Sequence, residues 1–239
     1  MRPRLFEKFY LFAFLCLTSL SIKGHAATGN WELGLSMANA LSGSLNLGQS
    51  LQAAELAFGG TVSRKIPMKW KLAGKAQELW VGLGGMNGDV IYTSSSGQRR
   101  GYHYHLDLVS QWRIYVTKNF YAAFDLHIAL LDQVNIFAKV NSEINEEQFT
   151  STSHTQLTGS GFGLGGSLGY IFEFRFLGMK MTMGVAPFLR YNLNTYATRV
   201  DRVIVINQST NAVDVSEEQV SGNFTWTTLY GGLTINFTI

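Results

Sequence analysis

The sequence predicts an all-β fold, a transmembrane antiparallel up-and-down β-barrel of about eight strands. Three observations support this prediction. Apolar and polar residues alternate with a period of two along most of the chain after residue 30, which is typical of half-exposed strands. The apolar face of these segments is bulky, whereas the opposite face is small and polar. The connections between the segments alternate between short and long along the chain.

The first 26 residues have the layout of a cleaved secretory signal peptide. Arg2, Arg4 and Lys8 form a basic region, an apolar run covers residues 10–22, and small residues follow up to Ala26. The run is too short to span a bilayer, where about 20 apolar residues are needed. We therefore expect residues 1–26 to be removed and residues 27–239 to form one barrel domain. The single cysteine, Cys16, lies within the predicted signal, so no disulfide is expected.

The composition limits how the chain can enter a membrane and what it can bind. Hydrophobic residues make up 46% of the chain and charged residues only 15%. After residue 22 no run of about 18 apolar residues occurs, so insertion would have to use strands instead of helices. The formal net charge of +3 is too small to indicate a nucleic-acid partner.

The first four predicted strands lie between residues 31 and 114. In the third of them the apolar parity changes, which predicts a β-bulge near Gly74 to Gln77. The apolar faces are, in chain order, Trp31, Leu33, Leu35 and Met37; Leu56, Phe58, Gly60 and Val62; Trp70, Leu72, Leu79, Val81 and Leu83; and Tyr102, Tyr104, Leu106, Leu108, Trp112 and Ile114.

The last four predicted strands lie between residue 120 and the C-terminus. Their polar faces consist mainly of Gly, Ala, Ser and Thr with isolated charges, so these faces are the crowded ones. A bulky apolar exterior around a tightly filled polar interior is typical of a lipid-embedded barrel. The apolar faces are Phe120, Ala122, Phe124, Leu126, Ile128 and Leu130; Phe162, Leu164, Leu168, Tyr170, Phe172 and Phe174; Met179, Met181, Met183, Val185, Pro187, Leu189 and Tyr191; and Leu229, Leu233, Ile235, Phe237 and Ile239.

The connections predict short periplasmic turns and long extracellular loops. The last long connection contains an apolar run and a polar turn at residues 208–211, so we expect it to be a hairpin that continues the strands beyond the membrane. A ten-stranded barrel stays open, because the loop at 135–159 could hide another hairpin, and so does a soluble periplasmic barrel. The short connections are at 64–69, 117–119 and 177–178, and the long ones are at 42–51, 86–101, 135–159 and 197–222.

In these features the chain resembles the small outer-membrane barrels of the OmpA transmembrane-domain, OmpX and OmpW type, from about residue 30 to residue 239. The ending LYGGLTINFTI adds to the resemblance, although Ile239 stands where such barrels commonly end in an aromatic residue and Phe237 lies two residues before it. The resemblance implies the outer membrane of a Gram-negative bacterium. It also implies contact with outer-membrane lipid and lipopolysaccharide, and recognition of the last strand by the barrel-assembly machinery.

His103, His105 and Asp107 have the His-x-His-x-Asp spacing that occurs in some metal centres. On a strand, however, His103 and Asp107 are about 13–14 Å apart, which is too far for one ion to bind all three residues. The two histidines alone could share a metal near the extracellular mouth if a neighbouring strand supplied further ligands. We therefore assign no metal and no cofactor from the sequence.

Strand parity directs a set of charged residues into the lumen. Since buried charges are costly unless they are paired, we expect a network that fills the barrel and not a wide channel. Within it, Arg113 should pair with Asp125, and His127 should lie close to Asp107. The predicted network is His103, His105, Asp107, Arg113, Asp125, His127, Glu173, Arg175, Lys180 and Arg190.

A catalytic alternative comes from the resemblance, because small outer-membrane barrels include lipid A acyltransferases and deacylases that use His with Ser and an acid. Here His154 has Ser151 and Ser153 nearby in a segment that also carries Glu143, Glu146 and Glu147. No predicted strand shows an outward His-x-Ser pair, so we expect no enzyme. The favoured function is envelope structure and surface contact, with a possible extracellular ligand at the long loops. A narrow conduit for small or hydrophobic solutes is the alternative, and a lipid-modifying enzyme comes third.

Overall fold

The computed structural model describes residues 30–46, 50–67, 74–94, 97–144, 147–176 and 179–238, so the predicted signal peptide lies outside the described residues. The strands are β1 (Trp31–Asn46), β2 (Ser50–Ile66), β3 (Gln77–Ser94), β4 (Gly97–Tyr115), β5 (Phe120–Ile144), β6 (Glu147–Phe176), β7 (Met179–Asn207) and β8 (Val213–Thr238). No helix among the described residues is long and apolar enough to cross a membrane.

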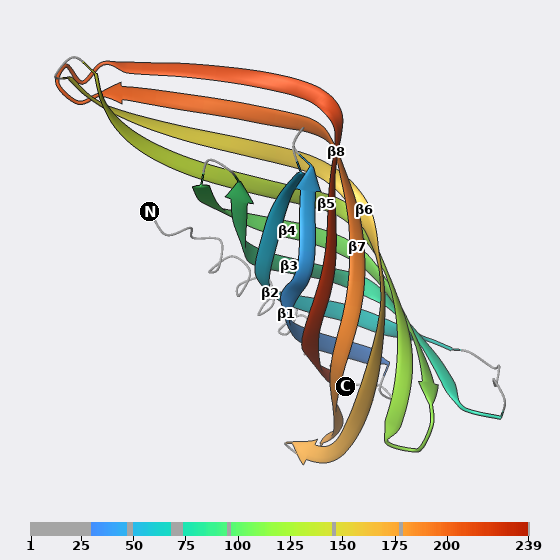
Figure 1. Cartoon of the computed structure of the whole chain (residues 1–239). Coiled ribbons are helices and arrows are strands. Elements are labelled where there is room, and N and C mark those ends of the chain that lie inside the picture. The colour runs from blue at the N-terminus through green and yellow to red at the C-terminus, as the bar shows by residue number, and fades with distance from the viewer. Residues whose placement is uncertain are drawn as a thin grey trace.

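The strands form a closed ring in which each pairs with its neighbours in sequence (Figure 1). All the pairings are antiparallel, and β1 closes the ring on β8, with Leu33 opposite Phe237. The predicted up-and-down barrel is therefore confirmed. The described residues between 135 and 159 belong to β5 and β6, which pair with each other up to Ile144 and Glu147, so they add no further strand to the ring.

The exterior of the ring is a belt of exposed apolar side chains. Many of the inward residues between them are small or polar, as in the first strand, where Glu32 and Ala38 are buried. An apolar belt of this extent is costly in water and requires hydrocarbon around it. Its most exposed members are Leu35, Met37, Leu41, Leu56, Phe58, Leu83, Leu106, Phe124, Ile128, Leu130, Phe162, Leu164, Leu168, Tyr170, Phe172, Leu189 and Tyr191.

The connections predicted as long loops are instead mostly strand. β3 runs to Ser94 and β4 begins at Gly97, so nearly all of the predicted loop at 86–101 pairs in the sheet. The segment at 197–222 is a hairpin with its turn at residues 208–212, and this prediction is confirmed. Alternating polar residues in these segments keep pairing because a ladder satisfies the backbone groups that a loop would leave to water.

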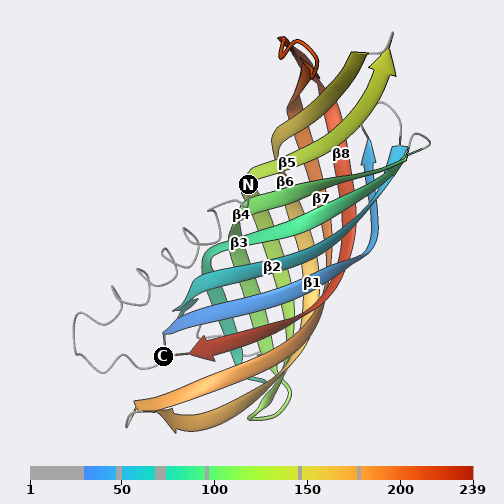
Figure 2. The same ribbon diagram turned by 90° about the vertical axis from the view of Figure 1, so that its left-hand side faces the viewer.

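Four strands continue past the ring as a separate sheet (Figures 1 and 2). The pairing of β8 with β1 ends at Trp226, and that of β4 with β5 ends at Phe137. Beyond these points β5, β6, β7 and β8 pair only with one another. We call this part the projecting sheet; it comprises residues 138–144, 147–156, 197–207 and 213–225.

The bulge predicted at Gly74 to Gln77 is not a bulge. Gly74 has φ +74°, in the left-handed region that glycine adopts easily, and β3 begins only at Gln77. The segment is therefore a turn, and Trp70, on the other side of the predicted bulge, lies outside the described residues.

One bulge in β5 determines which residues of that strand face the lumen. Asp107 pairs with Ala129 and Leu106 pairs with Leu131, so Leu130 is an extra residue between them. A side-chain period of two means that one extra residue reverses the inward parity of everything after it. Asp132 consequently faces the lumen and is completely buried.

Glycine and aromatic side chains complement each other inside the ring. Gly169 pairs with Tyr121, whose buried ring covers it: a Cβ on Gly169 would lie 2.1 Å from Tyr121 Cζ. Gly166 on the same strand faces outward, and a Cβ there would meet only the Ala123 carbonyl oxygen at 3.5 Å.

We expect Gly169→Ala to destabilise the barrel by about 1–3 kcal/mol, because the added methyl group must displace a buried ring. Gly166→Ala is the matched control, and it should change stability by less than about 0.5 kcal/mol. Urea unfolding of the refolded barrel in detergent measures both. Equal effects of the two substitutions would contradict the packing of Tyr121 on Gly169.

Candidate functional site

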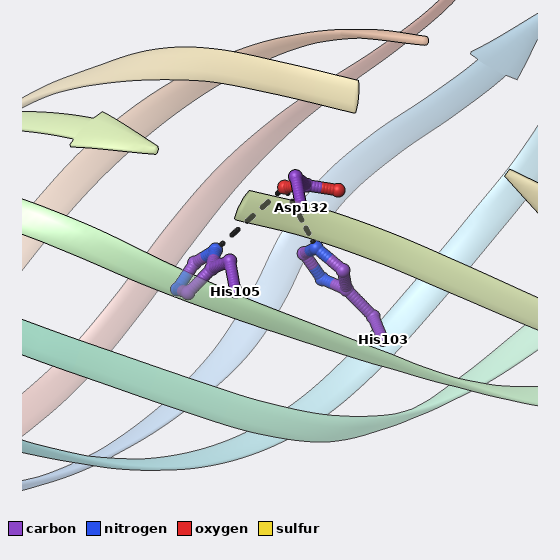
Figure 3. Close-up of side chains that lie close together, drawn as sticks. All are labelled: His103, His105 and Asp132. Atoms are coloured by element: carbon purple, nitrogen blue, oxygen red, sulfur yellow. Dashed lines mark hydrogen bonds and ion pairs between the residues drawn. The ribbon is translucent and has the colours of Figure 1, made fainter. Parts of the chain in front are cut away.

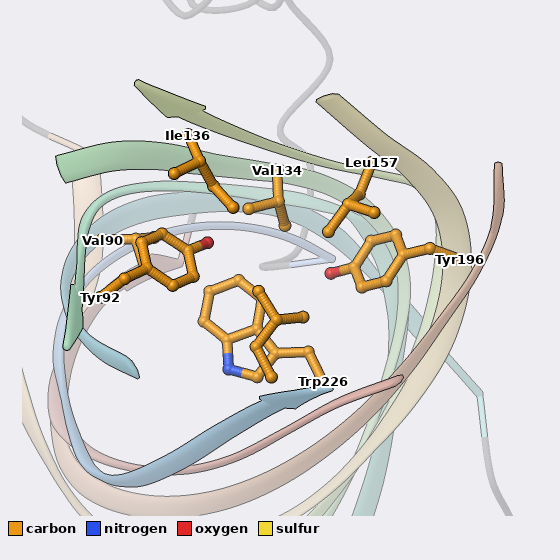
Figure 4. Close-up of a cluster of buried hydrophobic side chains, with 8 residues drawn as sticks. Val90, Tyr92, Val134, Ile136, Leu157, Tyr196 and Trp226 are labelled. Atoms are coloured by element: carbon orange, nitrogen blue, oxygen red, sulfur yellow. The ribbon is translucent and has the colours of Figure 1, made fainter. Parts of the chain in front are cut away.

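An apolar plug fills the lumen at the end from which the projecting sheet extends. Its side chains point toward the barrel axis (Figure 4). They exclude water from this end, since each is at most 4% exposed. The plug consists of Leu45, Val90, Tyr92, Val134, Ile136, Leu157, Tyr196 and Trp226.

Below the plug lies a chain of alternating acids and histidines. His103 Nδ1 is 3.1 Å from Glu55 Oε1, and His103 Nε2 is 3.0 Å from Asp132 Oδ2. His105 Nδ1 is 3.9 Å from the same Asp132 oxygen, and His105 Nε2 is 3.5 Å from Asp107 Oδ2. These residues come from β2, β4 and β5, so the chain joins the neighbouring strands β4 and β5 and links both to β2 on the far side of β3.

The chain continues through His127 to Arg190. His127 Nδ1 lies 3.2 Å from Asp107 Oδ2, as the sequence predicts, and 3.1 Å from Arg190 Nη1. The Arg190 guanidinium also lies over the Tyr230 ring, with 5.6 Å between its Cζ and the ring centroid. The Tyr230 hydroxyl donates to Glu55, which brings the network back to its first member.

Arg113 has a different partner from the one the sequence predicts. Its Nη1 and Nη2 donate to the Glu32 carboxylate at 2.6 and 2.5 Å, so the pair is bidentate and joins β4 to β1. Asp125 instead accepts a hydrogen bond from Gln111 Nε2 at 2.6 Å, because the strand register places these two residues opposite each other. Arginine is long enough to reach across the lumen to a better-placed carboxylate.

A cavity of about 70 Å³ remains between these groups. Its lining includes Glu32, Asp125, His127, Arg190 and Asn236. A water molecule needs roughly 10–15 Å³ of such volume, so the cavity has room for a few waters. The acid–histidine chain lies on its side toward the plug, and the Arg113–Glu32 pair lies on its side toward the short turns.

Three residues of the predicted network lie elsewhere. Glu173 and Arg175 are exposed, because β6 extends beyond the start of β5, where Phe120 pairs with Tyr170. The Glu173 carboxylate lies 3.5 Å from Lys118 Nζ at the surface. Lys180 pairs with Arg175 in the same extension, and its side chain lies outside the described part of the chain. The alternation along β6 and β7 predicts that these residues share a face with the lumen residues. At this end, however, β6 and β7 extend beyond the ring, so that face no longer borders the lumen.

His154, the candidate catalytic base, lies in the projecting sheet. Its ring stacks on Phe137 with a centroid separation of 4.6 Å, and its Nε2 is 3.0 Å from Asn135 Oδ1. Partial burial, and after it the Arg202 guanidinium, lower the pKa of His154 below its usual value. In the described residues no hydrogen bond joins this ring to Ser151 or Ser153.

Asp132 is the functional candidate that reasoning from the sequence missed. Strict alternation through β5 places Tyr121, Asp125 and His127 inward, and it would place Asp132 outward. The signal that could have revealed the change is the pair of consecutive apolar residues Leu130 and Leu131, which breaks the alternation where the bulge occurs.

No family model and no curated protein matches this sequence. Among solved structures, the major outer membrane protein of Thermus thermophilus is similar with a TM-score of 0.40 and 10% identity, over 86% of this chain and 99% of that chain. The outer membrane protease OmpT of Escherichia coli gives a TM-score of 0.31 and 10% identity, over 92% and 100% of the two chains. The transport unit of the Escherichia coli autotransporter AIDA-I gives 0.31 and 9%, over 96% of both. These low values say nothing about activity.

We expect Glu32→Gln to lower the free energy of unfolding by about 3–5 kcal/mol, because it leaves the buried charge of Arg113 without its counter-ion. Denaturant unfolding of the variants in detergent measures this loss. A double-mutant cycle of Arg113→Ala with Glu32→Gln should give strong coupling. The same cycle with Asp125→Asn is the control, and strong coupling there would restore the pairing predicted from the sequence.

Proposed function

We propose that this chain is a non-enzymatic integral outer-membrane protein of a Gram-negative bacterium. Its barrel is a closed anchor in the envelope, and its projecting sheet makes contacts at the cell surface. The observation that carries the proposal is the filled lumen, which combines an apolar plug with a buried network of charges and histidines.

The lumen favours an anchor over a conduit because two barriers oppose the passage of a solute, an apolar plug and a buried ion pair. The plug offers no hydrogen-bonding groups to a passing ion beyond the tips of Tyr92, Tyr196 and Trp226. Below it, the Arg113–Glu32 pair crosses the lumen between β4 and β1. A solute would have to break a desolvated ion pair and displace close-packed side chains, and each of these steps costs several kcal/mol.

The exposed apolar belt supports membrane insertion, and the two ends of the barrel support an orientation. The turn at residues 116–119 and the ends of β2 at Ile66 and β6 at Phe176 lie at one end of the barrel, and the projecting sheet lies at the other (Figure 2). By the rule that outer-membrane barrels have short periplasmic turns, the projecting sheet faces the outside. The partners would then be outer-membrane lipid, lipopolysaccharide and an extracellular ligand of the sheet.

The last strand supports assembly by the barrel-assembly machinery. β8 runs to Thr238 and is amphipathic, with Leu233 exposed and Asn236 buried. It is also the strand that closes the ring on β1. Recognition of this strand therefore would precede closure of the barrel.

We expect the purified protein to show no discrete conductance steps in planar lipid bilayers, because the lumen is filled. A porin added to the same membrane is the control that the recording detects channels. Stable, reproducible steps from this protein alone would overturn the closed-anchor proposal and favour the narrow-pore alternative.

A tag inserted after Thr210, in the turn between β7 and β8, should be cut by protease on intact cells. The matched insertion after Lys118, in the turn between β4 and β5, should be cut only after the outer membrane is permeabilised. Immunoblotting for the tag measures both. Reversed accessibility would contradict the orientation and would place the projecting sheet in the periplasm.

A further inference from the structure

Three donor groups converge just below the apolar plug. His103, His105 and Asp132 point toward one another from β4 and β5 (Figure 3). Their donor atoms lie within 4.8 Å of one another, and all three residues are buried. In a tetrahedral zinc site, bonds of about 2.0–2.1 Å place ligand atoms about 3.3 Å apart. Side-chain movements that shift the donor atoms by at most roughly 1.5 Å would bring the three atoms to that spacing.

The second nitrogen of each imidazole faces another carboxylate. His103 presents Nε2 to Asp132 and Nδ1 to Glu55, at 3.0 and 3.1 Å. His105 presents Nδ1 to Asp132 and Nε2 toward Asp107, at 3.9 and 3.5 Å. Metal-binding histidines commonly have a carboxylate behind the ring, which fixes the tautomer and increases the basicity of the nitrogen that binds the metal. His103 has this arrangement through its hydrogen bond with Glu55, whereas His105 Nε2 faces Asp107 at 3.5 Å without a hydrogen bond.

Two atoms of the cluster lack hydrogen bonds despite their burial. Among the described residues, Asp132 Oδ1 and His105 Nε2 are buried without a hydrogen bond of good geometry, although the Tyr196 hydroxyl interacts with the Asp132 carboxylate and Asp107 lies 3.5 Å from His105 Nε2. A buried polar atom without a partner costs free energy, and such atoms commonly mark the place of a water or an ion. The unsatisfied oxygen belongs to the same carboxylate that faces both imidazole rings.

The charge balance of the lumen favours an added cation. Among the described residues, five carboxylates are buried (Glu32, Glu55, Asp107, Asp125 and Asp132), against two guanidinium groups (Arg113 and Arg190), so the remaining positive charge comes either from protons on the paired histidines or from a bound cation. Glu32 is paired with Arg113, so Arg190 is the guanidinium group that remains for the acids nearer the plug. A divalent ion beside Asp132 would offset the excess negative charge in a region from which water is excluded.

We propose that His103, His105 and Asp132 form a binding site for one divalent transition-metal ion of the zinc class. Two imidazoles and one carboxylate suit Zn²⁺ and Co²⁺, whereas Ca²⁺ and Mg²⁺ prefer oxygen ligands alone. The ion would cross-link β4 to β5, and through Glu55 it would stiffen the contact with β2. The site would therefore lock the lumen shut at the level of the plug.

The surroundings imply that the ion enters during folding. The Trp226 ring lies 4.5 Å from the His103 ring, between centroids, and belongs to the plug that covers the site. Exchange through the closed barrel would require displacement of these side chains. The test should therefore supply the metal while the barrel refolds.

The experiment refolds the chain, without its signal peptide and without a histidine tag, into detergent in the presence of Co²⁺ or Zn²⁺, followed by extensive dialysis. We expect one metal ion per chain by elemental analysis, and visible d–d absorption for the Co²⁺ form. The metal should also raise the unfolding midpoint, since a ligand that binds only the folded state stabilises it. Asp132→Asn and His105→Gln should each lose the bound ion and this midpoint shift.

Two matched variants separate the site from its surroundings. His127→Gln removes a neighbouring lumen histidine that is not among the three donors, so it should retain one ion per chain. Glu55→Gln should retain the ion with about 10–100-fold weaker affinity, because it removes the carboxylate behind His103. Circular dichroism verifies that each variant is folded, and if Asp132→Asn does not fold, His105→Gln decides the question.

The proposal is overturned if the folded wild-type protein retains no Co²⁺ or Zn²⁺ after dialysis, in which case the histidines are paired through protons alone. It is also overturned if His127→Gln loses the ion as completely as His105→Gln, because the metal would then bind elsewhere in the lumen.

Discussion

The narrow interior of an eight-stranded ring is the constraint on which the rest of this structure depends. Such a ring has room for side chains and little bulk water. Its exterior must be apolar, so the polar residues of every strand face inward and meet there. Each inward charge therefore needs a partner inside the ring, and Arg113 finds Glu32 across the lumen. Closure of the barrel completes this neutralisation, since the Arg113–Glu32 pair and the Tyr230–Glu55 contact join strands that are not neighbours along the chain.

Glycine gives this crowded interior the space that its large polar groups need. Gly88 pairs with His103, and a Cβ on Gly88 would lie 2.4 Å from Glu55 Oε1. The Glu55–His103 contact thus occupies volume that any larger residue at position 88 would fill. Glycines in these strands cost backbone entropy, and the contacts that they permit offset part of this cost. The inward glycines therefore leave the volume that the side chains of the ionic network occupy.

Alternation in the sequence predicts the fold because every strand of a lipid-facing barrel alternates apolar residues that face lipid with residues that face the lumen. The same rule predicts that His103, His105, Asp107 and Arg113 face the lumen, since β4 has no bulge of its own. It does not predict that Arg113 reaches Glu32, which lies 81 residues away in sequence, because partner choice depends on how the ring closes. The rule also does not predict that the connections at 42–51, 86–101 and 135–159 are largely strand, because polar alternation in a loop and in a hydrated strand look alike.

The bulge at Leu130 connects the two chemistries of the lumen. Before it, β5 places Asp125 and His127 inside; after it, β5 places Asp132, Val134 and Ile136 inside. Without the extra residue, Gln133 and Phe137 would face the axis instead, and the apolar plug would lose two of its members. The same residue places the Asp132 carboxylate between His103 and His105. A single irregularity thus closes the mouth of the barrel with apolar side chains and sets the carboxylate of the proposed metal site directly beneath them, where water is excluded and ligand bonds are strongest.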